Sequence, residues 1–372
     1  MARFVVTADS HIGKNTGLYP GRLAEQEQVW RQTLDIARDL SVDAVLHAGD
    51  LFDSRRPTPD VVLAAERPLV EHSADDGCPV LVISGNHDIP SQDGACGLDV
   101  LSEAGLIRLS RTPEAWYFQG AHVVTLPWTP PHRLLSQDET GDRAQVFARV
   151  ADLLVDAAAG HGVIEDEPRL LLAHWAVSES LLPSGSAVAA LNEPVLPFER
   201  LRSRFDWMVF GHIHRRQQIG GSDRAFYAGS PQPLDHGDTG QHGVWLLDTD
   251  RQECTFMPIE STRFVTIDVD AGDPVAYREF EDAVVRVRIR ATEEQAREIN
   301  PAEIRETLMS CAKSVTGITV DVQREHRDRP AIVADDVTPE SALAAWLDHR
   351  GVNGQKQAVL ARAATYLERA VA

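Results

Sequence analysis

Histidines and aspartates recur along this 372-residue chain in one ordered series, and each member comes directly after a run of apolar residues. The series consists of Asp9-Ser10-His11, Gly49-Asp50-Leu51-Phe52-Asp53, Gly85-Asn86-His87-Asp88, His174 and Gly211-His212-Ile213-His214. Imidazole and carboxylate groups suit divalent first-row metal ions, and the lack of thiolate argues against a softer site. We interpret the motifs as parts of one site that holds two ions about 3.5–4 Å apart through a bridging carboxylate. Such a site retains a net positive charge, which favours a phosphodiester.

Each motif taken alone also has an ordinary structural explanation. Taken alone, Asp9-Ser10-His11 is more often a cap or a loop, Gly49-Asp50 is usually a turn, and His174 is more often a buried, hydrogen-bonded histidine. The order of the motifs and their position after apolar runs are what favour a function. Six other histidines fit no such pattern, and we interpret them as core or surface residues: His47, His72, His122, His132, His161 and His349.

The apolar runs that precede the motifs predict buried strands. Their aliphatic and β-branched content with little alternation suits strands covered on both faces. The candidate strands are residues 4–8, 44–48, 80–84, 122–126, 170–173, 207–210, 225–228 and 244–247. Amphipathic patterns predict helices at 23–40 and 143–159.

This alternation of strands and helices predicts an α/β sandwich with a largely parallel sheet. The carboxyl ends of parallel strands converge on the ligand crevice, so we expect the five motifs to meet in space. We also expect Gly49, Gly85 and Gly211 to let the backbone turn sharply where their strands end.

The sequence changes character near Ser261. A strand-like segment covers 263–269, and in 284–290 three aliphatic residues alternate with Arg286, Arg288 and Arg290. Asn300-Pro301 opens a helix, and residues 318–322 form a further strand pattern. Thr338-Pro339 starts another helix that Gly351 ends, and a last helix covers 355–370. We therefore divide the chain into 1–262, a small α+β domain at 263–333, and C-terminal helices at 334–372.

The bulk composition is that of a globular protein, with 43% hydrophobic and 25% charged residues. No apolar run reaches the roughly 18–20 residues that cross a membrane, and the first residues carry no leader pattern, so we expect a cytoplasmic protein. The four cysteines form no paired motif and are expected to be reduced thiols. The net charge of −20 argues against nucleic-acid binding by total charge alone, and leaves local contacts open.

The motifs together resemble those of the calcineurin-like metallophosphoesterase superfamily, and within it those of the SbcD family, the nuclease subunits of bacterial SbcCD complexes. The similarity rests on Thr7-Ala8-Asp9-Ser10-His11-Ile12-Gly13, Ala48-Gly49-Asp50-Leu51-Phe52-Asp53, Tyr227-Ala228-Gly229-Ser230-Pro231 and the Val-Arg-Val-Arg strand. It implies a β-sandwich flanked by helices, followed by an α+β capping domain that contacts DNA and by C-terminal helices. The match is loose over 174–205.

The resemblance also implies roles for individual residues. One metal ion would be held by Asp9, His11, Asp50 and His214, and the other by Asp50, Asn86, His174 and His212. His87 would stay free of metal and act as a general acid, with Asp88 orienting it. The implied cofactors are two divalent ions, with manganese expected. The implied reaction is in-line attack of a metal-activated hydroxide on phosphorus.

The resemblance implies endo- or exonuclease activity on DNA ends and hairpins, in DNA repair and recombination, within a homodimer that works with an SbcC-like coiled-coil ATPase. Leu343, Trp346 and Leu347 suit a docking face for that ATPase, but packing on the chain's own core explains them equally well. Local DNA contact is expected from Arg55, Arg56, Arg215 and Arg216, whereas the Arg286, Arg288 and Arg290 row suits a solvated strand face at least as well.

Three other functions are compatible with parts of the sequence. A phosphodiesterase for cyclic nucleotides or other small molecules has the same ligands but usually lacks a capping domain, so the segment after Ser261 speaks against it. A non-cutting scaffold would not need the complete ligand set. A protein phosphatase places Asp-Arg-Gly where this chain has Asp53-Ser54-Arg55.

Overall fold

Two six-stranded sheets form the centre of the molecule. The computed structural model describes residues 2–15, 19–75, 77–89, 94–134, 142–161, 167–182, 184–188, 191–238, 240–273, 280–323, 338–351 and 354–371. The first sheet has the strand order β14-β13-β1-β2-β3-β4, and the second has the order β11-β12-β10-β7-β6-β5.

The strands of the first sheet are β1 (Arg3–Thr7), β2 (Ala44–His47), β3 (Val80–Ile83), β4 (Arg108–Ser110), β13 (Gly243–Asp248) and β14 (Glu253–Pro258). Those of the second sheet are β5 (Glu114–Phe118), β6 (Ala121–Leu126), β7 (Arg169–His174), β10 (Trp207–Gly211), β11 (Gln217–Ile219) and β12 (Ser222–Tyr227). In each sheet the central neighbours are parallel: β1 with β2, β2 with β3 and β3 with β4 in the first, and β6, β7, β10 and β12 in the second. Antiparallel pairs occur at the edges. The predicted α/β sandwich is confirmed, and it contains two mixed sheets instead of one largely parallel sheet.

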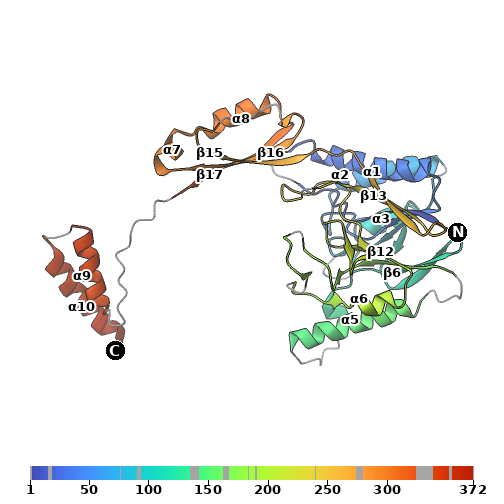
Figure 1. Cartoon of the computed structure of the whole chain (residues 1–372), viewed down its shortest axis with the longest axis horizontal. Helices are drawn as coiled ribbons and strands as arrows, with labels where there is room; N and C mark the ends of the chain where they lie inside the picture. The colour runs from blue at the N-terminus through green and yellow to red at the C-terminus, as the bar shows by residue number, and fades with distance from the viewer. Residues whose placement is uncertain are drawn as a thin grey trace. The chain divides into compact units, whose positions relative to one another are not determined.

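The sheets and helices stack in four layers (Figure 1), and clusters of apolar side chains fill the space between them. Between the two sheets lie Phe4 and Val6 of β1 with Leu172 of β7 and Val209 of β10. The helices α1 (Arg22–Asp39) and α2 (Pro59–Ala74) cover the outer face of the first sheet, and α5 (Arg143–Ala159) and α6 (Phe198–Arg202) cover that of the second. Because neighbouring residues of one strand face different apolar layers, the central strands read as unbroken apolar runs. The sheets therefore provide a rigid frame from which the loops at their carboxyl edge emerge.

A smaller three-stranded sheet follows, in the order β15-β16-β17. Its strands are β15 (Phe264–Asp270), β16 (Val284–Ala291) and β17 (Ser314–Val322), and α7 (Glu293–Glu298) and α8 (Pro301–Met309) lie between the last two in sequence. The alternation expected in β16 is confirmed, since Val285, Val287 and Ile289 are buried whereas Arg288 and Arg290 are exposed. The caps at Asn300 and Thr338 form as expected, each accepting a backbone N–H with its side chain.

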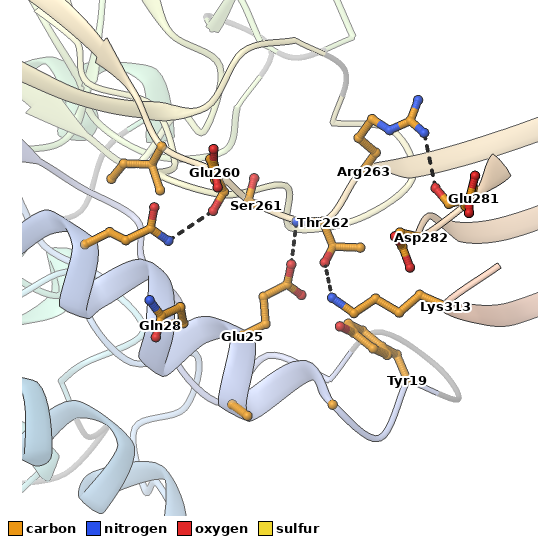
Figure 2. A pocket seen from close by; sticks show the side chains of 14 residues that line it. Tyr19, Glu25, Gln28, Glu260, Ser261, Thr262, Arg263, Glu281, Asp282 and Lys313 are labelled. Carbon is orange, nitrogen blue, oxygen red and sulfur yellow. Dashed lines mark hydrogen bonds between the residues drawn. The ribbon is translucent and has the colours of Figure 1, made fainter. Parts of the chain in front are cut away.

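Polar contacts around Thr262 connect helix α1 to the start of the small sheet (Figure 2). The carboxylate of Glu25 on α1 accepts the backbone N–H of Thr262 at 2.5 Å, and the ammonium of Lys313 donates to the Thr262 hydroxyl at 2.7 Å. Beside Thr262, the guanidinium of Arg263 donates to the Glu281 carbonyl at 3.4 Å. The chain therefore leaves the first sheet through a hydrogen-bonded junction, close to the boundary expected after residue 262.

The chain separates into two compact units, one of residues 1–289 and 300–320 and one of 290–299 and 321–372. The second contains the paired helices α9 (Pro339–His349) and α10 (Lys356–Val371). Within it Leu347 is buried, whereas half of the Trp346 side chain is exposed. The boundaries proposed after residues 262 and 333 stay a prediction, and the second falls at residues that the structure does not describe.

The remaining described elements are short: α3 (Gly97–Glu103), α4 (Pro131–Leu134), β8 (Ala176–Val177) and β9 (Val195–Leu196). Among the described residues, no helix is both long and apolar enough to span a membrane.

His47 is a histidine of the core whose side chain is completely shielded from solvent. Its ring is fully buried next to Trp30, and its Nε2 lies 2.8 Å from the hydroxyl of Ser10. Burial, reinforced by the positive charge of His174, lowers the pKa of His47 to about 3. His47 is therefore a neutral core histidine, as the sequence suggested. The side chains of His72 and His122 are also buried, that of His349 is exposed, and that of His132 lies outside the described residues.

A buried neutral histidine makes the fold sensitive to acid. Below about pH 6.5 the unfolded chain protonates this side chain while the folded chain does not until about pH 3, so stability falls as the pH falls through that window. We expect wild-type apoprotein to lose about 1.4 kcal/mol per pH unit more than a His47→Gln variant does between pH 6 and 4.5. Urea unfolding in chelator at several pH values measures this difference. Parallel stability curves for the two proteins would contradict it.

Candidate metal centre

Five loops at the carboxyl edge of the two sheets bring the predicted ligands together. In the first sheet, Asp9, Asp50 and Asn86 follow β1, β2 and β3. In the second, His174 ends β7 and His212 follows β10, and the register sets Gly211 beside His174. The two edges are joined directly, because the backbone N–H of His212 donates to both carboxylate oxygens of Asp9, at 2.9 and 3.2 Å.

The residues expected around the first ion converge. Nε2 of His11 lies 3.1 Å from Nε2 of His214 and 3.6 Å from Oδ2 of Asp50. Potential ligand atoms of Asp9, His11 and His214 all lie within 4.8 Å of one another. The side chains of Asp9, His11 and Asp50 are buried, whereas that of His214 is partly exposed.

The residues expected around the second ion converge beside them. Nε2 of His174 lies 3.3 Å from Oδ2 of Asp50 and 3.1 Å from Oδ1 of Asn86, and Nδ1 of His212 lies 3.0 Å from the same Asn86 oxygen. The Oδ2 atom of Asp50 thus lies between His11 on one side and His174 on the other, which is the position required of a bridging carboxylate.

The donor set fits two divalent ions. Ligand atoms bonded to one ion at about 2.0–2.2 Å lie roughly 3 Å from each other, which matches the spacing found in both groups. Metal-binding histidines usually form a hydrogen bond from their second ring nitrogen to an oxygen atom, which fixes the ring. Here Nδ1 of His11 lies 3.1 Å from Oδ1 of Asp53, Nδ1 of His174 lies 2.7 Å from the Ala48 carbonyl, and Nε2 of His212 lies 2.6 Å from Oε1 of Glu193.

The electrostatics of the cluster also favour cations. Burial by itself would raise the pKa of the Asp50 carboxyl, but the charges of His174 and His11 and the hydrogen bond from His174 hold it far below its usual range. Burial opposes protonation of His174, yet Asp50 and Asp9 raise its pKa to about 9. In the same way Asp53, Asp50 and Asp9 outweigh burial and raise the pKa of His11. The carboxylates therefore create a negative potential that attracts positive charge to this point.

Four of the ligands have left-handed backbone conformations, with φ of +53° at Asp9, +43° at His11, +56° at Asp50 and +93° at His212. Non-glycine residues rarely adopt this region, and such strain concentrates at functional sites. The strain follows from the geometry: each loop must turn back at once so that its side chain points to the common centre.

Asp88 has a different role from the one expected. Its buried carboxylate accepts hydrogen bonds from the backbone N–H groups of Asp50 at 2.8 Å, Gly85 at 2.9 Å and Phe52 at 3.1 Å. Burial and the charge of Asp50 raise the pKa of Asp88 to about 6. Asp88 therefore fixes the loop of the bridging ligand and not the ring of His87.

His87 is oriented by Asp53. Its Nδ1 donates to the backbone carbonyl of Asp53 at 2.8 Å, and its partly exposed ring packs edge-on against His11 at 4.8 Å. Its backbone N–H donates to Oδ1 of Asp50, so the bridging carboxylate is also tied to this loop. Since a carbonyl only accepts, Nδ1 of His87 carries a proton, and Nε2 is left for the substrate.

Two acidic residues were missed as site residues from sequence. Asp53 belongs to a motif that the sequence singled out, and its i+3 position after Asp50 was a usable signal. Glu193 lies in the loosely matched segment, with no pattern that marks it.

The glycines serve the site in two ways. Gly49 has φ of +90° and turns the chain as expected. Gly211 is not left-handed; it provides space, because a Cβ there would lie 2.1 Å from the Ala48 carbonyl oxygen and 2.8 Å from Nδ1 of His174. The expected turn at Gly211 stays a prediction, and close approach of the two sheets is a further reason for glycine there.

All four arginines proposed to contact DNA are exposed near the metal centre. Among them, the structure records an aromatic partner for Arg216. Arg55 donates from Nε to the Asn86 carbonyl at 3.3 Å, and Arg56 and Arg215 are exposed. The guanidinium of Arg216 lies 3.8 Å from the centre of the Phe256 ring, so this residue also has a packing role. DNA contact by these residues stays a prediction.

Residues 2–216, which carry every predicted ligand, match the model of the calcineurin-like phosphoesterase family. The chain belongs to this family. The match ends just after the paired histidines of the last motif.

Curated relatives confirm the resemblance to SbcD-type proteins. The chain is 25% identical over 275 residues to the DNA double-strand break repair protein Mre11 of Saccharolobus solfataricus, which covers 72% of this chain and 64% of that protein. It is 28% identical to the SbcD chain of nuclease SbcCD from Escherichia coli, covering 64% and 62%. It is 29% identical to the corresponding nuclease chain of Rhodobacter capsulatus, covering 66% of each. The chain therefore spans less than two thirds of the length of these relatives.

Replacing Gly211 by alanine should disturb both sheets at the centre. We expect Gly211→Ala to lower the stability of the apoprotein by about 1–3 kcal/mol, because an added methyl must displace Ala48 or His174. We also expect weaker binding of divalent metal ions, since His174 would move. Urea unfolding and calorimetric titration measure the two effects. Gly94→Ala, where a Cβ would meet nothing within 4 Å, is the matched control, and equal behaviour of the two variants would contradict the packing argument.

Proposed function

We propose that this protein is a metal-dependent nuclease that hydrolyses phosphodiester bonds of DNA with two divalent ions, manganese being the expected metal. The observation that carries the proposal is the geometry of the centre, in which Asp50 lies between two ligand groups and His87 stands beside them with Nε2 available. The names of the curated relatives, a double-strand break repair protein and nuclease subunits, support DNA as the substrate.

Two divalent ions bound there would neutralise the phosphate and activate water for attack on phosphorus. The chain's own groups then act on the leaving side. The Asp53 carbonyl holds His87 so that a protonated Nε2 can donate to the sugar oxygen as its bond to phosphorus breaks. Asp88 and the backbone N–H of His87 keep Asp50 in place during this step.

We further propose that the protein acts in the cytoplasm as a homodimer with an SbcC-like ATPase in DNA repair. Two of the relatives are named as subunits of the SbcCD nuclease, which supports such a complex. The exposed Trp346 on α9 is compatible with a docking role for the C-terminal helices. Because the chain carries a net charge of −20, DNA contact must depend on local arginines such as Arg55 and Arg215.

The decisive experiment compares wild-type protein with His87→Gln on end-labelled duplex and hairpin DNA, with manganese, magnesium or chelator. We expect manganese-dependent cleavage that falls about 10²–10⁴-fold in the variant, because general acid assistance is lost. Manganese content should not change, and measuring it tests whether His87, whose potential ligand atom lies within 4.8 Å of those of His11 and Asp53, holds metal. His161→Gln, at the end of α5, is the matched control. A wild-type protein that binds manganese yet leaves both substrates intact, with and without the ATPase, would refute the proposal.

The local-contact proposal makes a separate prediction about salt. Arg55→Gln and Arg215→Gln, introduced into the His87→Gln protein, should weaken DNA binding. The slope of log K against log salt should fall by about 0.9 for each phosphate that the variant no longer binds. Arg38→Gln, whose arginine pairs with Asp35 and Asp75 away from the centre, is the control. Fluorescence anisotropy at several salt concentrations measures the slope, and an unchanged slope would exclude these residues from the DNA interface.

A further inference from the structure

Glu193 contacts the metal centre from outside the two large sheets. It lies in the excursion between β7 and β10, where β8 and β9 pair in parallel. Its Oε1 lies 2.6 Å from Nε2 of His212, a distance typical of a strong hydrogen bond to a carboxylate. No step of the proposed reaction uses this residue.

The excursion is fastened to the second sheet and its helix. The N–H of Val177 donates to the hydroxyl of Tyr227, and the N–H of Phe198 donates to the hydroxyl of Ser178. The side-chain amide of Gln217 bonds both to the N–H and to the carbonyl of Leu181. These bonds give Glu193 a defined position relative to His212, whose loop leaves the same sheet.

His212 depends on such a partner more than His11 and His174 do. The side chains of His11 and His174 are 1% and 0% exposed, so packing fixes their rings, whereas that of His212 is 15% exposed. Its backbone is left-handed and held by Asp9, and its ring packs edge-on against His174 at 5.3 Å with Nδ1 3.0 Å from Oδ1 of Asn86. The contact with Glu193 further restrains the ring.

Charge gives Glu193 a second role, which it exerts through the imidazole. Potential ligand atoms of Asp9, Asp50 and His174 lie within 4.8 Å of one another, so these carboxylates serve both groups, whereas Asn86 adds only a neutral amide. Because the Nε2–H of His212 donates to the carboxylate of Glu193, Nδ1 becomes a stronger metal ligand.

We propose that Glu193 is the positioning residue of the second ion site, which sets the affinity of that site by fixing His212 with Nδ1 toward Asn86 and by strengthening Nδ1 as a metal ligand. This inference rests on the proposed two-ion centre. It assigns a role in metal binding to the segment between β7 and β10.

The test is manganese titration of apoprotein by calorimetry, with electron paramagnetic resonance of the loaded protein. We expect Glu193→Ala to weaken one of two manganese sites about 10–100-fold and Glu193→Gln to weaken the same site less, because glutamine still accepts a hydrogen bond. At two equivalents of manganese, the signal of coupled ions should give way to that of isolated and free ions. Glu199→Gln, an exposed glutamate of α6 that pairs with Arg202, should bind as wild type does.

A double-variant cycle separates positioning from a general structural effect. In a His212→Gln background, adding Glu193→Ala should change manganese affinity less than about twofold, because Glu193 acts through His212. An equal loss in both backgrounds, or two wild-type affinities in Glu193→Ala, overturns the inference. A wild-type protein that binds fewer than two ions instead overturns the two-ion centre itself.

Discussion

The buried charge of Asp50 is the constraint on which the architecture of the centre depends. Its carboxylate is 2% exposed at the junction of two sheets, where an unpaired charge would be very costly. One oxygen faces His11 and His174, the other accepts the N–H of His87, and Asp88 fixes the backbone behind it. These partners come from both sheets, so the charge of Asp50 is compensated only when the carboxyl edges of the two sheets come together. Ion binding would complete this compensation.

The close approach of the two sheets at this edge has a local cost that the apolar layers must offset. Four ligands occupy left-handed backbone conformations, each costing on the order of 1–3 kcal/mol. At Gly49 and Gly211 a side chain would collide with His174 or with the Ala48 carbonyl. The layer of residues such as Phe4, Leu172 and Val209 between the sheets holds the strand ends at that distance. A small deformation of this layer would therefore displace the metal-binding side chains at the strand ends.

Sequence reasoning succeeded where a residue's neighbours in sequence carry the information. Buried central strands such as β1 and β10 read as apolar runs, and polar residues at their ends marked the centre. It did not recover β5, whose half-exposed alternation is weak, or the division of strands between two sheets, since an apolar run does not reveal its partner. Asp88 was assigned to its neighbour His87, although its carboxylate turns back to the loop of Asp50. Glu193 contacts His212 only in the folded structure, so no local sequence pattern identifies it as a site residue.

The two ligand groups differ in how their histidines are held. Asp9 and Asp50 follow two adjacent strands of one sheet, and their carboxylates lie close to ligand histidines of both groups. The ring of His212 in the second group depends in addition on Glu193, which lies in the excursion between β7 and β10. A ligand set built on strands is rigid, whereas one completed by an excursion responds to whatever contacts that excursion. A contact on the segment between β7 and β10 would thus reach the second ion site through His212.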